Sequence, residues 1–145
     1  MKQAWRCGLR LSVILWLAAV VSAAGADEPA AKQDEAAHQV KALVEGDDFQ
    51  RREATKKLLE LGKGAVEPLA KKAAEAKPPA MYHCFDVLAR LLASENEASS
   101  NAAKVALDKL TESQNKSVAL RAKTVIRLKE ILGRRQAAIA AIPVL

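Results

Sequence analysis

The chain has 145 residues and a formal net charge of +6. Three bases and no acid lie within residues 1–26, so removal of that segment would leave a net charge of +3, which is too small to indicate a nucleic-acid-binding protein. Of the two cysteines, Cys7 lies in that segment and only Cys84 follows it. A single thiol cannot form an internal disulfide, so the fold must depend on packing alone.

Residues 1–26 are typical of a secretory signal peptide. Three bases precede an uncharged apolar run over 11–21, and small residues follow over 22–26. The small residues predict cleavage after Ala24 or Ala26. Because the apolar run is shorter than the ~20 residues of a membrane span, we expect the segment to be cleaved and not retained as an anchor. The signal pattern itself predicts export to the periplasm, the cell envelope or the exterior. Membrane attachment is expected only if the segment is retained as an anchor.

The segment after the signal divides into a leader and one helical domain. Residues 27–34 have no apolar period and predict a flexible leader, and residues 35–145 predict the domain. The first helix is expected over 35–45, with Gly46 as its end. Its apolar face consists of Ala36, Val40, Leu43 and Val44.

The second predicted helix has a defined start and end. Asp47 can accept hydrogen bonds from first-turn N–H groups, and Gln50, three residues later, fits a capping box. Gly62 can adopt the left-handed conformation that ends a helix. A third helix is expected from about Ala65, which would place Pro68 in the first turn, where it costs no intrahelical hydrogen bond.

The clearest amphipathic pattern follows Pro79, a residue suited to the start of a helix. Apolar residues then recur at helical spacing, at Met81, Cys84, Phe85, Leu88, Leu91 and Leu92. This pattern predicts a fourth helix with that face buried, and it predicts that Cys84 is a small buried apolar group.

Two further helices complete the predicted domain. The segment Ser94–Glu97 resembles a capping box for the fifth helix, and the sixth is expected from about Ser117 to Gly133 or beyond. Their apolar faces are Ala103, Ala106, Leu107 and Leu110 for the fifth, and Val118, Ala122, Val125 and Leu132 for the sixth. The apolar residues 137–145 would extend the sixth helix over the end of the core.

These patterns predict an all-α fold with about five to six helices after the signal peptide and no strand. A small-x3-Leu-x2-Leu pattern begins at Ala54, Cys84 and Ala103, at separations of 30 and 19 residues. The first separation fits a helix-pair repeat, whereas the second fits one helix following another. An irregular helical bundle therefore stays open as an alternative.

The segment 47–76 resembles one unit of a HEAT-type, armadillo-like α-helical repeat. The resemblance is carried by Arg52-Glu53-Ala54 in one helix and by Pro68-Leu69 in the next. It implies a short α-α superhelix of stacked antiparallel helix pairs with a concave protein-binding surface and no common catalytic residues. Single units of this kind resemble modules of exported bacterial proteins, notably those of planctomycetes. Residues 81–86 depart from the repeat pattern, so two or three units remain possible.

Few residues offer chemistry. The chain has two histidines, His38 and His83, and it has no nucleophile elbow, phosphate-binding loop or zinc-protease motif. His83 and Asp86 could share one metal ion, but such a site needs three or four ligands. We therefore predict no enzyme activity, no catalytic residue, no metal and no cofactor. A small hydrolytic or metal-binding enzyme is the remote alternative, and it would need a pocket that gathers Tyr82, His83 and Asp86 with distant groups.

The two ends of the domain differ in charge. Residues 27–48 contain seven acids and two bases, whereas residues 116–135 contain seven bases and one acid, Glu130. This asymmetry fits either head-to-tail contacts between copies or two solvated ends. Within the basic segment, Lys116, Lys123, Arg127 and Arg134 would lie within about 20° of one direction on a helix.

Our hypothesis is an exported, non-catalytic module that binds an unidentified protein partner or serves as a scaffold. The four aligned bases are the candidate interaction surface of an alternative, a protein that binds a membrane surface or an anionic polymer. Export argues against nucleic acid, and so does the scarcity of aromatic residues, since only Phe49, Tyr82 and Phe85 follow the signal and two of them should be buried. The oligomeric state is left open.

Overall fold

The computed structural model describes residues 27–140, with side chains described over 32–137, and within this part of the chain it contains six helices and no strand. The helices are α1 (Asp27–Glu45), α2 (Asp48–Leu61), α3 (Lys63–Glu75), α4 (Ala80–Leu92), α5 (Glu97–Thr111) and α6 (Lys116–Ala140). The predicted all-α fold is confirmed. The predicted signal peptide and the last five residues lie outside the described residues.

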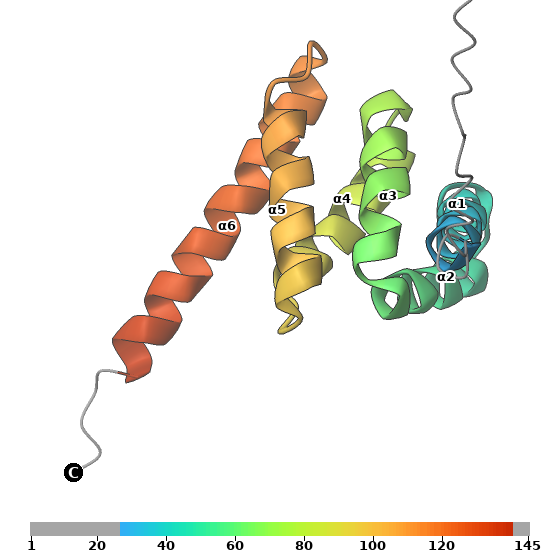
Figure 1. Ribbon diagram of the computed structural model, residues 1–145. Helices are drawn as coiled ribbons and strands as arrows, with labels where there is room; N and C mark the ends of the chain where they lie inside the picture. The colour runs from blue at the N-terminus through green and yellow to red at the C-terminus, as the bar shows by residue number, and fades with distance from the viewer. Residues whose placement is uncertain (1–26, 141–145) are drawn as a thin grey trace, which may run out of the picture.

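The helices form three pairs, α1–α2, α3–α4 and α5–α6, stacked side by side. In one layer, α3 lies between α1 and α5 and contacts both. In the second layer, α4 lies between α2 and α6 and contacts both. Helix α4 contacts all five other helices. In Figure 1, α3 and α5 run next to each other with α4 behind them, and α6 extends beyond α5.

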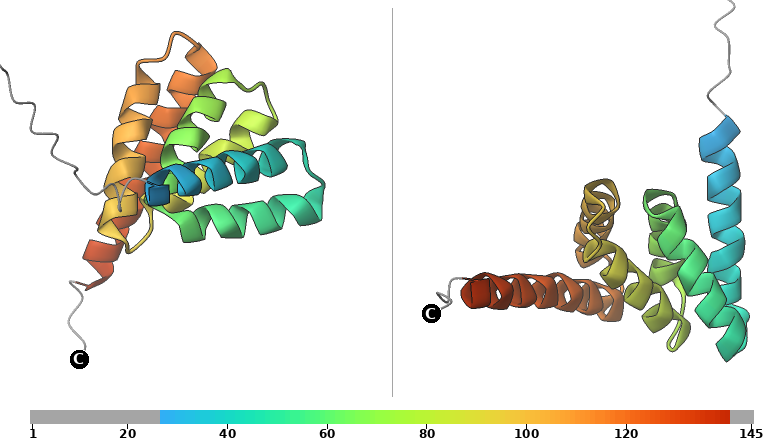
Figure 2. Two further views of the ribbon diagram at one scale, coloured as in Figure 1. Left: turned by 45° about the vertical axis from the view of Figure 1, so that its right-hand side comes forward. Right: turned by 90° about the horizontal axis from the view of Figure 1, so that it is seen from below.

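The helix pairing differs from the repeat unit that the sequence suggested. Segment 47–76 spans α2 and α3, but α2 packs mainly against α1 and α3 packs mainly against α4 and α1. Figure 2 shows α1 and α2 side by side, with α3 turning steeply away from the end of α2. A single residue, Gly62, separates α2 from α3, and this link is too short for the two helices to lie antiparallel along their lengths.

Two helices begin earlier than predicted. Helix α1 starts at Asp27, so residues 27–34, expected to be a flexible leader, form its first turns. Helix α3 starts at Lys63, which places Pro68 in the second turn rather than the first. Because proline has no N–H, α3 lacks the hydrogen bond that residue 68 would otherwise donate to the carbonyl of Gly64.

One predicted helix cap is confirmed and the other is displaced. The Gln50 N–H donates to Asp47 Oδ1 over 2.8 Å, and the Asp47 N–H donates to Gln50 Oε1 over 3.0 Å, which is the predicted capping box of α2. For α5 the cap is Asn96, whose Oδ1 accepts from the Ser99 N–H over 3.1 Å. Ser94 instead accepts from the Asn96 N–H, so the predicted box from Ser94 to Glu97 is wrong.

The core is centred on α4. All six predicted apolar residues of this helix are buried, and Val87 is buried as well, because α4 lies between neighbours on more than one side. Burial of each large side chain contributes about 1.5–3 kcal/mol relative to exposure. The described core cluster is drawn entirely from residues 36–125. We therefore expect residues 27–145 to fold without the preceding segment.

Helix α6 is longer than its partner. It has 25 residues against 15 in α5, so at about 1.5 Å per residue it extends about 15 Å past the end of α5. Val118, Ala122 and Val125 are buried as predicted, but Leu132 is 57% exposed because the neighbouring helix ends before it. Among the described residues, no helix is both long enough and apolar enough to cross a membrane.

Replacement of glycine by alanine should have opposite effects at Gly62, between α2 and α3, and at Gly133, within α6. Gly62 has a φ of +56°, and a Cβ there would lie 2.6 Å from Ser99 Oγ, whereas a Cβ at Gly133 in α6 would meet nothing within 4 Å. Gly62→Ala should lower the free energy of unfolding by about 1–3 kcal/mol. Gly133→Ala should raise it by up to about 1 kcal/mol, because alanine favours an exposed helix.

Urea unfolding of residues 27–145, followed by circular dichroism, measures both changes. Equal stabilities of the Gly62→Ala variant and the parent would show that this backbone position tolerates a side chain.

Candidate interaction site

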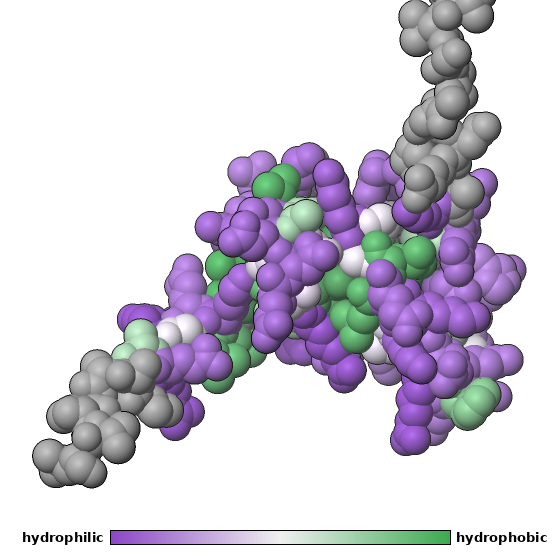
Figure 3. All heavy atoms as spheres, turned by 60° about the horizontal axis from the view of Figure 1, so that its bottom comes forward, coloured by the Kyte–Doolittle hydropathy of each residue, from purple (hydrophilic) through white to green (hydrophobic). Residues whose placement is uncertain are grey.

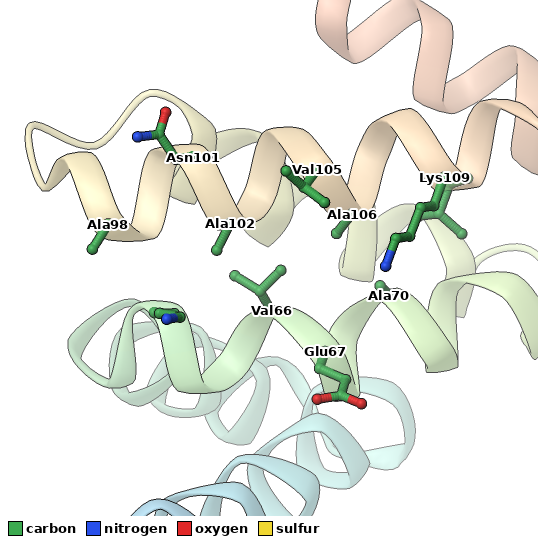
Figure 4. A pocket seen from close by; sticks show the side chains of 11 residues that line it. Val66, Glu67, Ala70, Ala98, Asn101, Ala102, Val105, Ala106 and Lys109 are labelled. Atoms are coloured by element: carbon green, nitrogen blue, oxygen red, sulfur yellow. The ribbon is translucent and has the colours of Figure 1, made fainter.

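An open groove of about 740 Å³ lies between α3 and α5. In Figure 4, Val66 and Ala70 of α3 face Ala102, Val105 and Ala106 of α5 across it. Val105 is 54% exposed, although Val66 is buried. The groove is therefore an accessible surface with an apolar floor.

The groove exists because small residues occupy the facing positions. On α5, apolar residues recur at Ala98, Ala102, Val105 and Ala106, a second stripe beside the core stripe of the same helix. Alanine side chains are too short to fill the space between two helices that also contact each other. Polar and charged residues form the rim of the groove, namely Lys63, Glu67, Asn101 and Lys109. This combination can accept the apolar face of a helix from another molecule.

Sequence reasoning did not find this groove. The core stripe of α5 was predicted, and Ala103, Leu107 and Leu110 are buried while Ala106 is half-buried at the groove. The spacing of Ala98, Ala102 and Val105 is the signal that was available. Its meaning depended on which helix lies opposite, and periodicity alone does not give that information.

A second, more polar groove of about 510 Å³ lies between α2 and α4. His83 and Asp86 line it, as do Arg51 and Arg90, but Tyr82 does not. Arg90 is paired with Asp86 over 3.0 Å, and Arg51 donates to the carbonyl of Gly46 over 3.0 Å. The residues of the remote enzyme alternative are thus not gathered in one pocket.

The charges of this polar groove are largely paired within the protein. Arg51 also bonds to Asp48, and this hydrogen bond, together with the charge of the guanidinium, lowers the pKa of the Asp48 carboxyl. Within the described residues, no group of three or more His, Cys, Asp and Glu side chains is arranged to hold a metal ion.

The four predicted surface bases, Lys116, Lys123, Arg127 and Arg134, are all exposed on α6. Because α6 is one continuous helix, these residues share one face, as predicted. Lys129 has a different role, since its Nζ donates to the Leu92 carbonyl over 2.5 Å and to Ser100 Oγ over 2.8 Å. It caps the C-terminus of α4 and fixes α6 against the other two helices.

The aromatic residues are more exposed than expected. Phe85 is buried, but Phe49 and Tyr82 are exposed, so the prediction that two of the three would be buried is wrong. The ring of Tyr82 lies 5.4 Å from the Arg121 guanidinium carbon of α6, which is a cation–π contact. His38 is exposed on α1.

The surface view in Figure 3 shows apolar side chains in several small areas separated by hydrophilic ones. No protein-family model, no curated protein and no solved structure matches this chain.

Cys84 is fully buried in α4, as predicted, and burial raises the pKa of its thiol from 9.0 to about 11. The thiol is therefore protonated at neutral pH and is shielded from reagents. For residues 27–145, which contain Cys84 but not Cys7, we expect no reaction with a disulfide reagent such as DTNB in the native form at pH 8, and one reactive thiol per chain in 6 M guanidinium chloride. Rapid labelling of the native form would contradict this packing.

Proposed function

We propose that this chain is an exported, non-catalytic module that binds a protein partner through the groove between α3 and α5. The observation that carries the proposal is the accessible apolar floor of that groove. The N-terminal segment of signal-peptide type supports export. The stacking of antiparallel helix pairs is of the kind that HEAT-type repeats use to bind other proteins, although the pairs here are offset from the unit 47–76 that carries the sequence resemblance.

The geometry of the groove favours a helical partner segment. Small floor residues such as Ala70 and Ala102 allow another helix to approach closely, and Val105 offers apolar area at the edge. The rim carries charges of both signs, with Lys63 and Glu67 on α3 and Lys109 on α5. Complementary charges on a bound helix would therefore fix its register along the groove. The partner is thus expected to present apolar residues at helical spacing flanked by charges.

The test is affinity capture from an envelope extract with immobilised residues 27–145. Val105→Glu places a charge on the groove, and Leu120→Glu places the same charge on α6, where Leu120 is 68% exposed. One protein should be recovered in stoichiometric amount by the parent and by Leu120→Glu. Recovery by Val105→Glu should fall at least tenfold, because a buried unpaired charge costs more than about 1.4 kcal/mol.

Equal recovery by all three forms would show that the groove is not the binding surface. If the partner protein is no longer recovered by Leu120→Glu but is still recovered by Val105→Glu, the binding surface lies on α6 and not in the groove.

A second candidate function, binding to an anionic membrane surface or polymer, is supported by the exposed row Lys116, Lys123, Arg127 and Arg134. Contacts between such bases and an anionic surface weaken as salt rises. The double variant Lys123→Glu/Arg127→Glu tests this candidate, because it removes two bases from the row without touching the groove.

A further inference from the structure

Helix α6 has a second apolar face that points away from the core. Leu120, Leu128 and Ile131 are 68%, 53% and 39% exposed, although Val118, Ala122 and Val125 of the same helix are buried. The outer side of an amphipathic helix that only covers a core is typically charged or polar. We name Leu120, Leu128 and Ile131 the outer apolar face.

Bases flank the outer apolar face. With Lys116 taken as the origin and about 100° per residue, Leu120, Ile131 and Leu128 lie at about 40°, 60° and 120°. The row of Lys116, Lys123, Arg127 and Arg134 lies near 0°, beside the apolar residues. On the other side, Arg121 lies at about 140°. Thr124, at about 80°, and Arg135, at about 100° and one turn beyond Ile131, lie within the same arc as the apolar residues. The outer face thus presents three large apolar side chains together with basic ones.

The outer apolar face is a ridge, not a groove. None of the grooves between the other helices that are described above is lined by an α6 residue, and the end of α6 extends beyond α5, as Figures 1 and 2 show. A single protruding helix offers little area to a rigid protein surface. It can lie along a deformable surface that closes around its apolar side chains.

The charge of α6 identifies the kind of surface. Residues 116–135 carry seven bases and one acid, so the α6 helices of two copies would repel each other, whereas an anionic surface would attract them. Tyr82 adds a further amphipathic group beside α6, because its half-exposed ring stacks with Arg121. Tyrosine is a residue type that is enriched at the headgroup level of membranes.

We propose that α6 is a membrane-surface helix that lies in the plane of a bilayer with anionic headgroups. Leu120, Leu128 and Ile131 enter the boundary between headgroups and acyl chains, and the flanking bases contact the headgroups. This proposal deepens the second candidate function and is independent of the groove between α3 and α5, so each can fail without the other.

The experiment uses residues 27–145 and lipid vesicles, after circular dichroism has established that each variant is folded. Both tryptophans of the chain, Trp5 and Trp16, precede residue 27, so Leu128→Trp introduces a single fluorescent reporter. Vesicles of phosphatidylcholine with phosphatidylglycerol should shift its emission to the blue, and pure phosphatidylcholine vesicles should not. Val105→Trp, in the groove, is the matched control and should show no shift with either.

Co-sedimentation with the same anionic vesicles measures affinity. Leu128→Glu/Ile131→Glu should bind at least tenfold more weakly than the parent, and Val105→Glu should bind equally well. Lys123→Glu/Arg127→Glu should also bind more weakly, and the parent should lose affinity as salt rises. This pattern would support insertion of the outer apolar face.

Three results would overturn the proposal. One is the absence of binding to anionic vesicles. Another is unchanged binding of Leu128→Glu/Ile131→Glu, which would leave a polyanion contact through the bases alone. The third is loss of a captured envelope protein for Leu128→Glu/Ile131→Glu together with equal vesicle binding, which would assign the outer apolar face to a protein partner.

Discussion

The burial of α4 on several sides is the constraint on which the rest of the structure depends. This helix contacts all five others and contributes seven buried side chains to the core. Burial of these side chains makes apolar packing around α4 a major source of stability. The position of every other helix follows from how it covers a face of α4 or of a helix that touches α4.

The two candidate interaction surfaces arise where this packing leaves apolar residues uncovered. Between α3 and α5, alanines are too short to close the space, and a groove results. Along α6, a 25-residue helix is paired with a 15-residue one, so its end has no neighbour, while its outer apolar face points away from the core over most of its length. The burial of Val118, Ala122 and Val125 sets which side of α6 faces the core, and the hydrogen bonds of Lys129 to Leu92 and Ser100 add to this orientation.

Helical periodicity predicted what depends on local sequence. The buried face of α4, the Asp47–Gln50 cap and the burial of Cys84 follow from residue types at fixed spacing, and all are confirmed. Gly62 has the positive φ expected of a glycine that ends a helix, but its ψ of −119° differs from that of the predicted left-handed conformation. What depends on a distant neighbour was missed. Periodicity placed Leu132 in the core because it could not reveal that α5 is too short to cover that part of α6. It also did not reveal which helix packs against α2. The groove was missed for the same reason, whereas the common face of the four bases on α6 required only a continuous helix.

The most direct test of this account is the stability of Leu88→Ala, which opens space in the core at a fully buried position of α4. We expect urea unfolding of residues 27–145 to remain a single transition, with a free energy of unfolding lower by about 2–5 kcal/mol. Leu120→Ala, on the exposed side of α6, should change it by less than about 0.5 kcal/mol. Two separate transitions, or equal small effects of both changes, would contradict a core organised around α4.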